Sequence, residues 1–326
     1  MGLSKPFLDA HIRDWEQKLK GQAYPHREKW PGHLFHHTPL GNAVGILMSG
    51  QMLSRRDSAQ VRTLDVAATG VIDNSQRAHR FVRLYFRPRT PTQYRIEGVQ
   101  KASDHQYGNN AHAPVLVMFV LDAHRVLSLD GVFFSDANMQ TGAIENSTEC
   151  FFKNIPFSKV YHEGGIGWDR NINSHRCAEV LAPSPMRLDD KLRWIYCRSE
   201  AERATLIAAL GKNAMVWGKK IIISDDLKVF EKRFAFVDKV LLTNEGVIFR
   251  LNPRSDAKPI AVSLEVRDAA GKVSVRMNTT ELSAAPPKAS AWQVKAKLRS
   301  SLYKVVITLK GHQAYSSTLM LDDVPF

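Results

Sequence analysis

Cysteine is scarce in this sequence, and that scarcity limits the chemistry it can carry. Only three of the 326 residues are cysteines, Cys150, Cys177 and Cys197, and no two of them form a Cys-x-x-Cys pair. So few thiols at such spacings provide neither a disulfide framework nor a thiolate zinc site. We therefore expect the protein to work in a reducing compartment.

Long apolar runs are also absent. No stretch approaches the ~20 consecutive apolar residues of a membrane-spanning helix. The first twenty residues alternate charged side chains with leucine and isoleucine, unlike the apolar centre of a signal peptide. These features predict a cytoplasmic protein that has no membrane partner.

Acidic residues are outnumbered by basic ones. The chain has 45 Lys and Arg against 32 Asp and Glu, which gives a formal net charge of +13 at pH 7. A basic excess favours an anionic partner such as nucleic acid, although solubility alone also explains it. With 44% hydrophobic residues, the chain is rich enough to bury the cores of two ordinary domains.

The first two thirds of the chain predict a mixed α+β domain. An apolar stripe at Leu8, Ile12, Trp15 and Leu19 indicates an amphipathic helix over residues 8–20. Further helices are expected at 40–50, 136–143 and 199–210. Strands are expected at 33–37, 82–87, 114–121, 126–128, 158–162 and 177–182.

The last third changes pattern and predicts an all-β domain. Short strands separated by glycine- and proline-containing turns are expected at 219–224, 237–243, 247–251, 260–267, 273–277, 291–296, 301–309 and 314–320. Such spacing is typical of a β-sandwich of ~100 residues, and we expect an Ig-like one. We place the boundary near residue 225, which gives a catalytic domain over 1–225 and a sandwich over 226–326.

One candidate site segment joins the strand at 33–37 to the helix at 40–50. His36 and Thr38 are two positions apart, so that their side chains project to the same face of a strand. Asn42 follows in the first turn of the helix, where phosphate binds well. Strand ends and caps explain His36 and Thr38 equally well. A metal interpretation of His33 and His37 is rejected, because no acidic or cysteine ligand follows at a matching spacing.

A second candidate segment is strongly basic. Residues 77–95 contain six arginines and no acidic residue, interleaved with four aromatic side chains that include Tyr85. Arginine and aromatic side chains together suit phosphates and stacked bases. The alternative interpretation is a half-buried strand with a solvated basic edge.

Two more segments complete the set. A short strand at 132–134 runs into Ser135, Asp136 and Asn138; helix capping explains Asp136 but explains Asn138 less well. Residues 176–181 form an apolar strand that carries one carboxylate, Glu179. A lone glutamate in such a run indicates a side chain aimed into a cleft.

These four segments, in this order, resemble the DarT family, whose members use NAD to ADP-ribosylate DNA bases and act as bacterial toxins. The resemblance depends on residues 34–38 with Asn42, on 84–91, on 134–138 and on 176–181. It covers about residues 33–210 and implies an ADP-ribosyltransferase fold, with NAD+ as co-substrate and no metal.

The resemblance also implies roles for single residues. His36, Thr38 and Asn42 would bind NAD, Tyr85 is added to that set, and Glu179 would be the catalytic glutamate. The family's catalytic arginine precedes its Tyr-Phe segment. Arg77 is chosen here, with Arg80 and Arg83 as competitors. The candidates for nucleic-acid contact are Arg83, Arg87, Arg89 and Asn138.

The sequence thus predicts an NAD-dependent nucleic-acid ADP-ribosyltransferase, a toxin of a toxin–antitoxin or phage-defence system. Single-stranded DNA is the acceptor that the family suggests, and RNA is the nearest alternative. A non-catalytic nucleic-acid-binding protein and a protein-modifying transferase are further alternatives. An antitoxin is the expected partner, and a chaperone is a second one; the sandwich would recruit substrate, dock such a partner, or serve only as a structural appendage.

Overall fold

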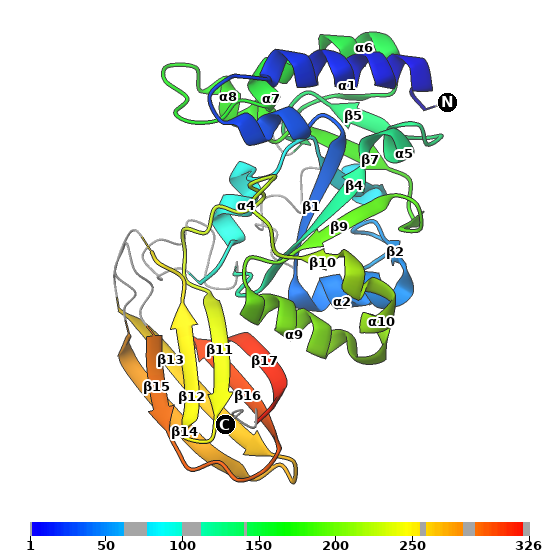
Figure 1. The fold of residues 1–326 in the computed structure, drawn as a ribbon. Coiled ribbons are helices and arrows are strands. Elements are labelled where there is room, and N and C mark those ends of the chain that lie inside the picture. Colours follow the sequence, from blue (N-terminus) through cyan, green and yellow to red (C-terminus); the bar gives the residue numbers. More distant parts are fainter. Residues whose placement is uncertain are drawn as a thin grey trace. The chain divides into compact units, whose positions relative to one another are not determined.

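The computed structural model describes residues 2–61, 77–99, 112–139, 142–254, 259–282 and 291–321. The chain divides into two compact units that interleave along the sequence (Figure 1). Met1–Arg95, Met118–Tyr196 and Ser224–Glu231 form the first unit, and Ile96–Val117, Cys197–Ile223 and Lys232–Phe326 form the second. A domain boundary near residue 225 stays a prediction. Within the described ranges, none of the helices has the length and apolar character needed to cross a bilayer.

A sheet with antiparallel strand pairs forms the centre of the first unit. Its strands are β1 (His33–Pro39), β3 (Val82–Tyr85), β4 (Leu116–Asp122), β5 (Phe133–Ser135), β6 (Glu145–Asn146), β7 (Glu179–Ala182) and β9 (Leu192–Tyr196). They follow the order β9-β4-β1-β3-β7-β5-β6. Every residue of β4 is buried, as its unbroken apolar sequence requires for a strand covered on both faces. A separate two-stranded sheet pairs β2 (Gln51–Met52) with β8 (Met186–Arg187).

Short helices surround this sheet. They are α1 (Lys5–Leu19), α2 (Leu40–Ser49), α4 (Pro91–Ile96), α5 (Ala123–Leu127), α6 (Glu149–Asn154), α7 (Phe157–Val160) and α8 (Asn171–His175), with 3₁₀ turns η1 (Pro25–Lys29) and η2 (Ala78–Arg80). Helix α1 lies beside α6 and α7 (Figure 1), and its Trp15 ring contacts Phe157 at 5.8 Å. Leu8, Ile12 and Leu19 are buried, which confirms the apolar stripe predicted for this helix.

Three predicted elements of the first unit are wrong. Residues 126–128 were expected to form a strand, but Val126 and Leu127 belong to α5, where the Asp122 side chain accepts a hydrogen bond from the Arg125 N–H. Residues 158–162 were expected to form a strand, but 157–160 form α7. Both segments are short apolar runs, whose periodicity does not separate strand from helix. The helix expected at 136–143 is absent over residues 136–138; residues 140 and 141 lie outside the described ranges.

The second unit is built on two antiparallel sheets. One has the order β11-β12-β15, from β11 (Val237–Thr243), β12 (Gly246–Leu251) and β15 (Ala291–Lys295). The other has the order β14-β13-β16-β17, from β13 (Ile260–Asp268), β14 (Val273–Leu282), β16 (Leu302–Leu309) and β17 (His312–Met320). The mixed α/β part and these antiparallel sheets confirm the predicted fold class at that level; an Ig-like topology remains a proposal.

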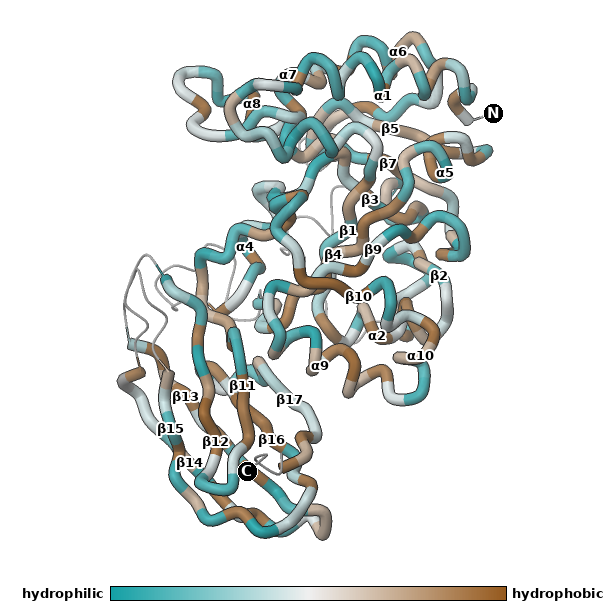
Figure 2. Tube along the Cα trace, viewed as in Figure 1, coloured by the Kyte–Doolittle hydropathy of each residue, from teal (hydrophilic) through white to brown (hydrophobic). Residues whose placement is uncertain are grey.

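Buried apolar residues at every second position of the strands form the core of the second unit. Ile260, Val262, Leu264 and Val266 are buried on β13, and the hydrophobic residues of these strands are brown in Figure 2. Gly246 begins β12 where β15 approaches so closely that a Cβ atom would lie 2.0 Å from the Val294 carbonyl oxygen. Only glycine fits at that position.

The same unit includes the segment that follows β9. It consists of α9 (Glu200–Leu210), η5 (Gly211–Asn213), α10 (Ala214–Trp217), η6 (Gly218–Lys220) and β10 (Ile221–Ile222). Ala201 of α9 belongs to the core of the antiparallel sheets, and the Thr205 hydroxyl accepts a hydrogen bond from the Ser316 N–H at 3.2 Å. A strand was predicted at 219–224, but only Ile221–Ile222 form one, because residues 218–220 form the 3₁₀ turn η6.

Candidate active site

All four predicted site segments contribute to adjacent strands, in the order β1-β3-β7-β5. Phe35 of β1 pairs with Tyr85 of β3, and Tyr85 pairs with Glu179 of β7. Glu179 is the first residue of its strand and is 0% exposed. The structure therefore places a buried carboxylate beside the segment that carries His36 and Thr38.

Arg83 is the ionic partner of Glu179. Its Nε lies 2.5 Å from Glu179 Oε2 and its second nitrogen lies 2.5 Å from Oε1, so the contact is bidentate. Burial opposes charge on the Arg83 guanidinium, but the neighbouring Glu179 carboxylate raises the pKa of Arg83. A bidentate pair fixes both oxygen atoms of the glutamate in one orientation.

The fourth segment holds the backbone of Glu179. Ser135, the last residue of β5, accepts a hydrogen bond from the Glu179 N–H at 3.2 Å, and its hydroxyl donates to the Ala137 carbonyl at 2.7 Å. One buried hydroxyl thus links the start of β7 to the loop that contains Asn138. That loop is also held by His175, whose Nδ1 lies 2.7 Å from the Asp136 carbonyl oxygen.

The two neighbouring histidines of β1 make different contacts. His36 Nδ1 lies 2.9 Å from the Arg83 carbonyl oxygen, whereas the His37 ring stacks on Tyr85 with ring centroids 5.4 Å apart. Burial lowers the pKa of His37 to about 3 and also lowers that of His36, so both rings are neutral near pH 7. Burial, and after it Glu179, raises the pKa of Tyr85, which keeps its hydroxyl protonated.

Other predicted site residues lie as follows. Arg77 is 68% exposed in its side chain, and its Nε pairs with Glu145 at 2.7 Å. Thr38 is buried on β1, and Asn42 lies partly buried in the first turn of α2. Asn138 is partly buried in the loop after β5. The structure thus brings Arg83, and not Arg77, into contact with Glu179.

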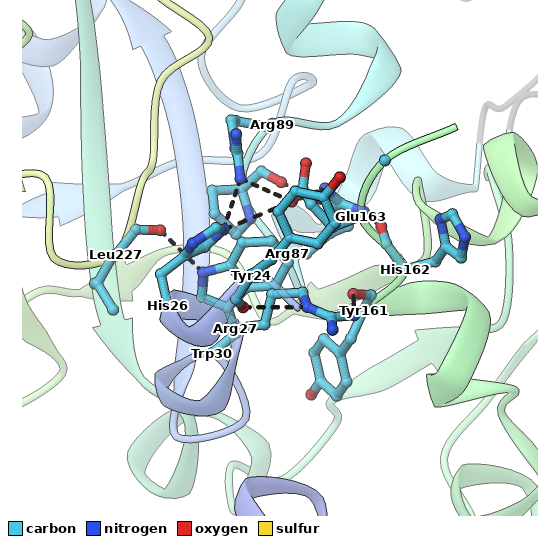
Figure 3. Close-up of polar contacts among 12 residues, drawn as sticks. Tyr24, His26, Arg27, Trp30, Arg87, Arg89, Tyr161, His162, Glu163 and Leu227 are labelled. Atoms are coloured by element: carbon cyan, nitrogen blue, oxygen red, sulfur yellow. Dashed lines mark hydrogen bonds and ion pairs between the residues drawn. The ribbon is translucent and has the colours of Figure 1, made fainter. Parts of the chain in front are cut away.

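Arg87 and Arg89 belong to a second cluster, drawn in Figure 3. Their guanidinium groups lie 3.2 Å and 2.7 Å from the same oxygen atom, Glu163 Oε2. The Trp30 ring lies 4.9 Å from the Arg87 guanidinium carbon and 6.0 Å from that of Arg89. Trp30 itself is fully buried and donates a hydrogen bond to the Leu227 carbonyl at 3.0 Å.

Further cationic and neutral groups surround this cluster. Arg27 donates to the Tyr161 carbonyl at 3.1 Å, and Arg176 donates to the Gly164 carbonyl at 2.6 Å. Arg89 lies 2.8 Å from His26 Nε2. Because a guanidinium only donates, that nitrogen accepts and His26 is neutral. Burial, and next the charge of Arg89, lowers the pKa of His26, consistent with this assignment.

The sequence analysis missed several of these residues. Ser135 was treated only as part of a polar cluster, and His26, Trp30 and Glu163 were not considered. The contact between Glu163 and Arg87 joins residues 76 positions apart, which no local pattern reveals. Among the described residues, His, Cys, Asp and Glu side chains form no group of three that could hold a metal ion.

Comparison with known proteins identifies relatives of the first part of the chain. The sequence model of the family described as ssDNA thymidine ADP-ribosyltransferase, DarT, matches residues 35–227. A search of curated proteins found no match.

A search of the solved structures gave the following matches. Thermus sp. 2.9 DarT in complex with ADP-ribosylated ssDNA is 15% identical, with 60% of this chain and 96% of that chain covered at a TM-score of 0.48. The same protein in complex with NAD+ is 16% identical, with 60% and 97% covered at 0.44. Thermosipho africanus DarTG in complex with ADP-ribose is 16% identical, with 66% and 54% covered at 0.44. The family assignment depends on the sequence model, which matches more than half of the chain.

Proposed function

Because this chain belongs to the DarT family, the NAD-dependent ssDNA thymidine ADP-ribosyltransferases, we propose that it transfers ADP-ribose from NAD+ to thymidine in single-stranded DNA. The observation that carries the proposal is the buried Glu179, held by Arg83 and Ser135 inside the matched region.

Glu179 is proposed as the catalytic carboxylate. In the reaction, the bond between nicotinamide and ribose breaks and nicotinamide leaves, while a nucleophilic atom of the base bonds to the ribose and loses its proton. Positive charge develops on the ribose during this exchange, and a fixed carboxylate beside it stabilises that charge. The same carboxylate can accept the proton of the base.

Arg83 is proposed as the positioning partner of this carboxylate. Its bidentate contact favours the ionised form of Glu179 and aims it before substrate arrives. Arg77, the arginine chosen from the sequence, is proposed to neutralise pyrophosphate or orient the base, and Arg80 competes with it for that role. Their contributions can be separated by substitution.

Four residues are proposed to bind NAD. His36 and Thr38 lie on β1, Asn42 lies in the first turn of α2, and Tyr85 lies beside Glu179. The neutral imidazole of His36 and the protonated hydroxyl of Tyr85 can hydrogen-bond a ribose without adding charge. The N–H groups at the start of α2 suit the phosphates.

The nucleic-acid contacts are proposed for Arg83, Arg87, Arg89 and Asn138. The formal charge of +13 favours approach of a polyanion. RNA remains the alternative acceptor, because basic and aromatic surfaces bind either polymer. A non-catalytic nucleic-acid-binding protein would need neither Glu179 nor its ion pair. A protein acceptor is disfavoured by the basic charge.

We further propose a cellular role. The enzyme would act in the cytoplasm as the toxin of a toxin–antitoxin or phage-defence system, with an antitoxin as its partner and a chaperone as a second one. Modification of DNA bases would block replication, so such an activity requires a partner that restrains or reverses it.

The proposed reaction is tested with labelled NAD. The purified chain is incubated with it and, in parallel, with thymidine-containing ssDNA, matched ssDNA without thymidine, total RNA and cell protein. We expect label only on the thymidine-containing ssDNA, and none with Glu179→Gln. Label on RNA would move the acceptor, and label on no polymer alongside intact ssDNA binding would favour the non-catalytic alternative.

A further inference from the structure

The cluster in Figure 3 holds more positive than negative charge. Arg27, Arg87 and Arg89, labelled in Figure 3, interact electrostatically with Glu163, and so does a fourth arginine, Arg176. A second carboxylate, Glu231, acts on Arg87 and Arg176. Burial lowers the pKa of Arg87, which is 2% exposed, so its charge is held at a cost.

Two of the four arginines converge on one oxygen atom. Glu163 Oε2 lies 2.7 Å from Arg89, 3.2 Å from Arg87 and 3.8 Å from His26 Nε2. Two guanidinium groups that converge on a single oxygen anion match the way arginine binds phosphate. The carboxylate thus occupies the place that a phosphate oxygen would take.

Arg89 has one hydrogen-bond donor that is not used. Its Nε is buried and makes no hydrogen bond within the described part of the chain. Its backbone has a φ of 52°, a left-handed conformation unusual for a residue with a side chain. Gln93 holds that conformation, because its side-chain oxygen accepts the Arg89 N–H at 2.9 Å. A buried unsatisfied donor on a strained backbone points to a ligand.

The carboxylate that fills this place lies at the start of a glycine-rich loop. Gly164 has a φ of 86° and Gly167 has a φ of 54°, conformations that glycine adopts at little cost. Trp168 in the same loop is fully exposed. Displacement of Glu163 would therefore act through the backbone of its own loop and would include release of the Gly164 carbonyl from Arg176, which donates to it at 2.6 Å.

Part of the cluster comes from outside the region that matches the family. His26, Arg27 and Trp30 precede residue 35, where the match begins. Arg87 follows Tyr85 by two residues, and Arg176 precedes Glu179 by three. The cluster thus extends from the two strands of the candidate active site toward an N-terminal segment that precedes the matched residues.

We propose that Arg87 and Arg89 form a phosphate subsite, and that Glu163 occupies it as an internal substitute until a phosphate displaces it. The nucleic-acid strand is the expected source, and the pyrophosphate of NAD is the other. This inference rests on the proposed function, since it assigns the subsite to that function's substrates.

Binding of a labelled thymidine-containing ssDNA strand, measured by fluorescence anisotropy, tests the subsite. Glu163→Gln should tighten binding ~5-fold, because it removes the competing charge, and Arg89→Gln should weaken it ~10-fold. Arg89→Gln should also reduce the slope of log K against log salt by about 0.7. When Glu163→Gln is combined with Arg89→Gln, it should no longer increase the affinity for ssDNA.

Glu265→Gln is the matched control. Glu265 also pairs with two arginines, Arg267 at 2.6 Å and Arg276 at 2.5 Å, but in the second unit. It changes the net charge by the same amount and should leave ssDNA affinity unchanged. If Glu163→Gln weakens ssDNA binding, or if it changes neither the ssDNA affinity nor the NAD affinity relative to this control, Glu163 only braces the arginines and the proposal is overturned.

Two further measurements make the outcome decisive. Calorimetric titration with NAD separates the sources: a change in NAD affinity with unchanged ssDNA affinity assigns the phosphate to the co-substrate. A second test uses the wild-type protein only, so its result does not depend on how any variant folds. A series of ssDNA strands each carries one neutral methylphosphonate linkage at a different position, and the strand in which that linkage replaces the bound phosphate should bind with lower affinity. Because these readouts are binding, failure of the transferase activity would leave them interpretable.

Discussion

At the level of single residues, we expect replacement of Arg83 to reduce activity far more than replacement of Arg77. Arg83→Gln removes both contacts to Glu179 and leaves the carboxylate buried without its partner, so transfer should fall at least ~100-fold. Arg77→Gln removes one exposed pair with Glu145 and should cost less than ~10-fold. Initial rates with labelled NAD and ssDNA check the difference.

Arg77→Lys and Arg83→Lys serve as controls, because each keeps the charge and loses the planar fork. If Arg83→Lys retains full activity, a point charge suffices and bidentate aiming is not needed. Equal losses for Arg77→Gln and Arg83→Gln would mean that both arginines only contribute to a shared electrostatic surface.

Ser135 is expected to matter although it touches no substrate in the proposed mechanism. Ser135→Ala leaves the buried Glu179 N–H and the Ala137 carbonyl without their partner, which should cost about 1–3 kcal/mol of unfolding free energy. The turnover number should fall with little change in KM for NAD, since the variant misplaces the carboxylate. Chemical denaturation and steady-state kinetics measure both effects.

A serine in the second unit provides the comparison. Ser263 shares a hydrogen bond with Thr308 at 2.5 Å, and Ser263→Ala should cost stability without changing the turnover number. A Ser135→Ala variant that behaves the same way would assign Ser135 a purely structural role.

The sequence singled out candidate residues more readily than the contacts that they make. Glu179 stood out because it was the lone carboxylate of an apolar strand, and the structure buries it on β7. A side chain aimed into a cleft stays a prediction. Arg83 was named only among several arginines, because six of them lie within 19 positions. Which arginine faces the glutamate depends on the register between β3 and β7, and register is a property of the folded sheet.

At the level of elements, we expect helix α1 to make the stability of the fold sensitive to low pH. The His11 ring packs against Phe152 at 4.8 Å and Phe157 at 4.6 Å, and burial lowers its pKa to about 4. The unfolded chain binds a proton near pH 6.5 and the folded chain does not. Stability should therefore fall as the pH drops below 6.5, by about 2 kcal/mol at pH 5 from this histidine alone.

Replacing the histidine tests that assignment. His11→Phe keeps an aromatic ring on α6 and α7 and cannot take up a proton, so the loss between about pH 7.5 and about pH 5 should shrink by about 2 kcal/mol. Urea unfolding at the two pH values measures it. His37, with a pKa near 3, contributes in the same direction and remains as a background. An unchanged pH dependence would show that His11 is protonated in the folded state.

Long periodic elements were predicted well and short apolar ones were not. Helix α1 and most long strands of the second unit follow their expected ranges closely, because many positions report the same period. Strand β14 is an exception, since it was expected at 273–277 and extends over Val273–Leu282. Segments 126–128 and 158–162 offered only a few apolar residues each. Their caps decide the outcome: Asp122 begins α5, and Pro156 precedes α7.

At the scale of the whole molecule, each unit combines three separate stretches of the sequence, so no single boundary position divides the chain. Residues 96–117 and 197–223 group with the C-terminal strands, although the sequence gives no sign of a change at residue 96. Such grouping depends on contacts between distant segments, as in the hydrogen bond from the Lys232 N–H to Glu97 Oε1 at 2.7 Å. Truncation near 225 would cut through this unit, so substitutions test the sandwich more cleanly.

The C-terminal sheets offer a basic surface for that test. Lys295, Lys297 and Arg299 are exposed at alternate positions on and after the edge strand β15. If the sandwich recruits nucleic acid, reversing all three charges to glutamate should weaken ssDNA binding at least ~10-fold and reduce the salt slope, since each lost phosphate contact removes about 0.7 from it. Anisotropy at several salt concentrations measures both quantities.

Charge reversal also acts at long range, so an equal change elsewhere is needed to separate position from net charge. Arg13, Lys18 and Lys20 are exposed on or just after α1, and their reversal changes the net charge by the same amount. Recruitment requires the β15 variant to lose more affinity than the α1 variant. Equal losses would mean that ssDNA responds only to the overall charge, and the sandwich would then be left with docking of a protein partner or a structural role.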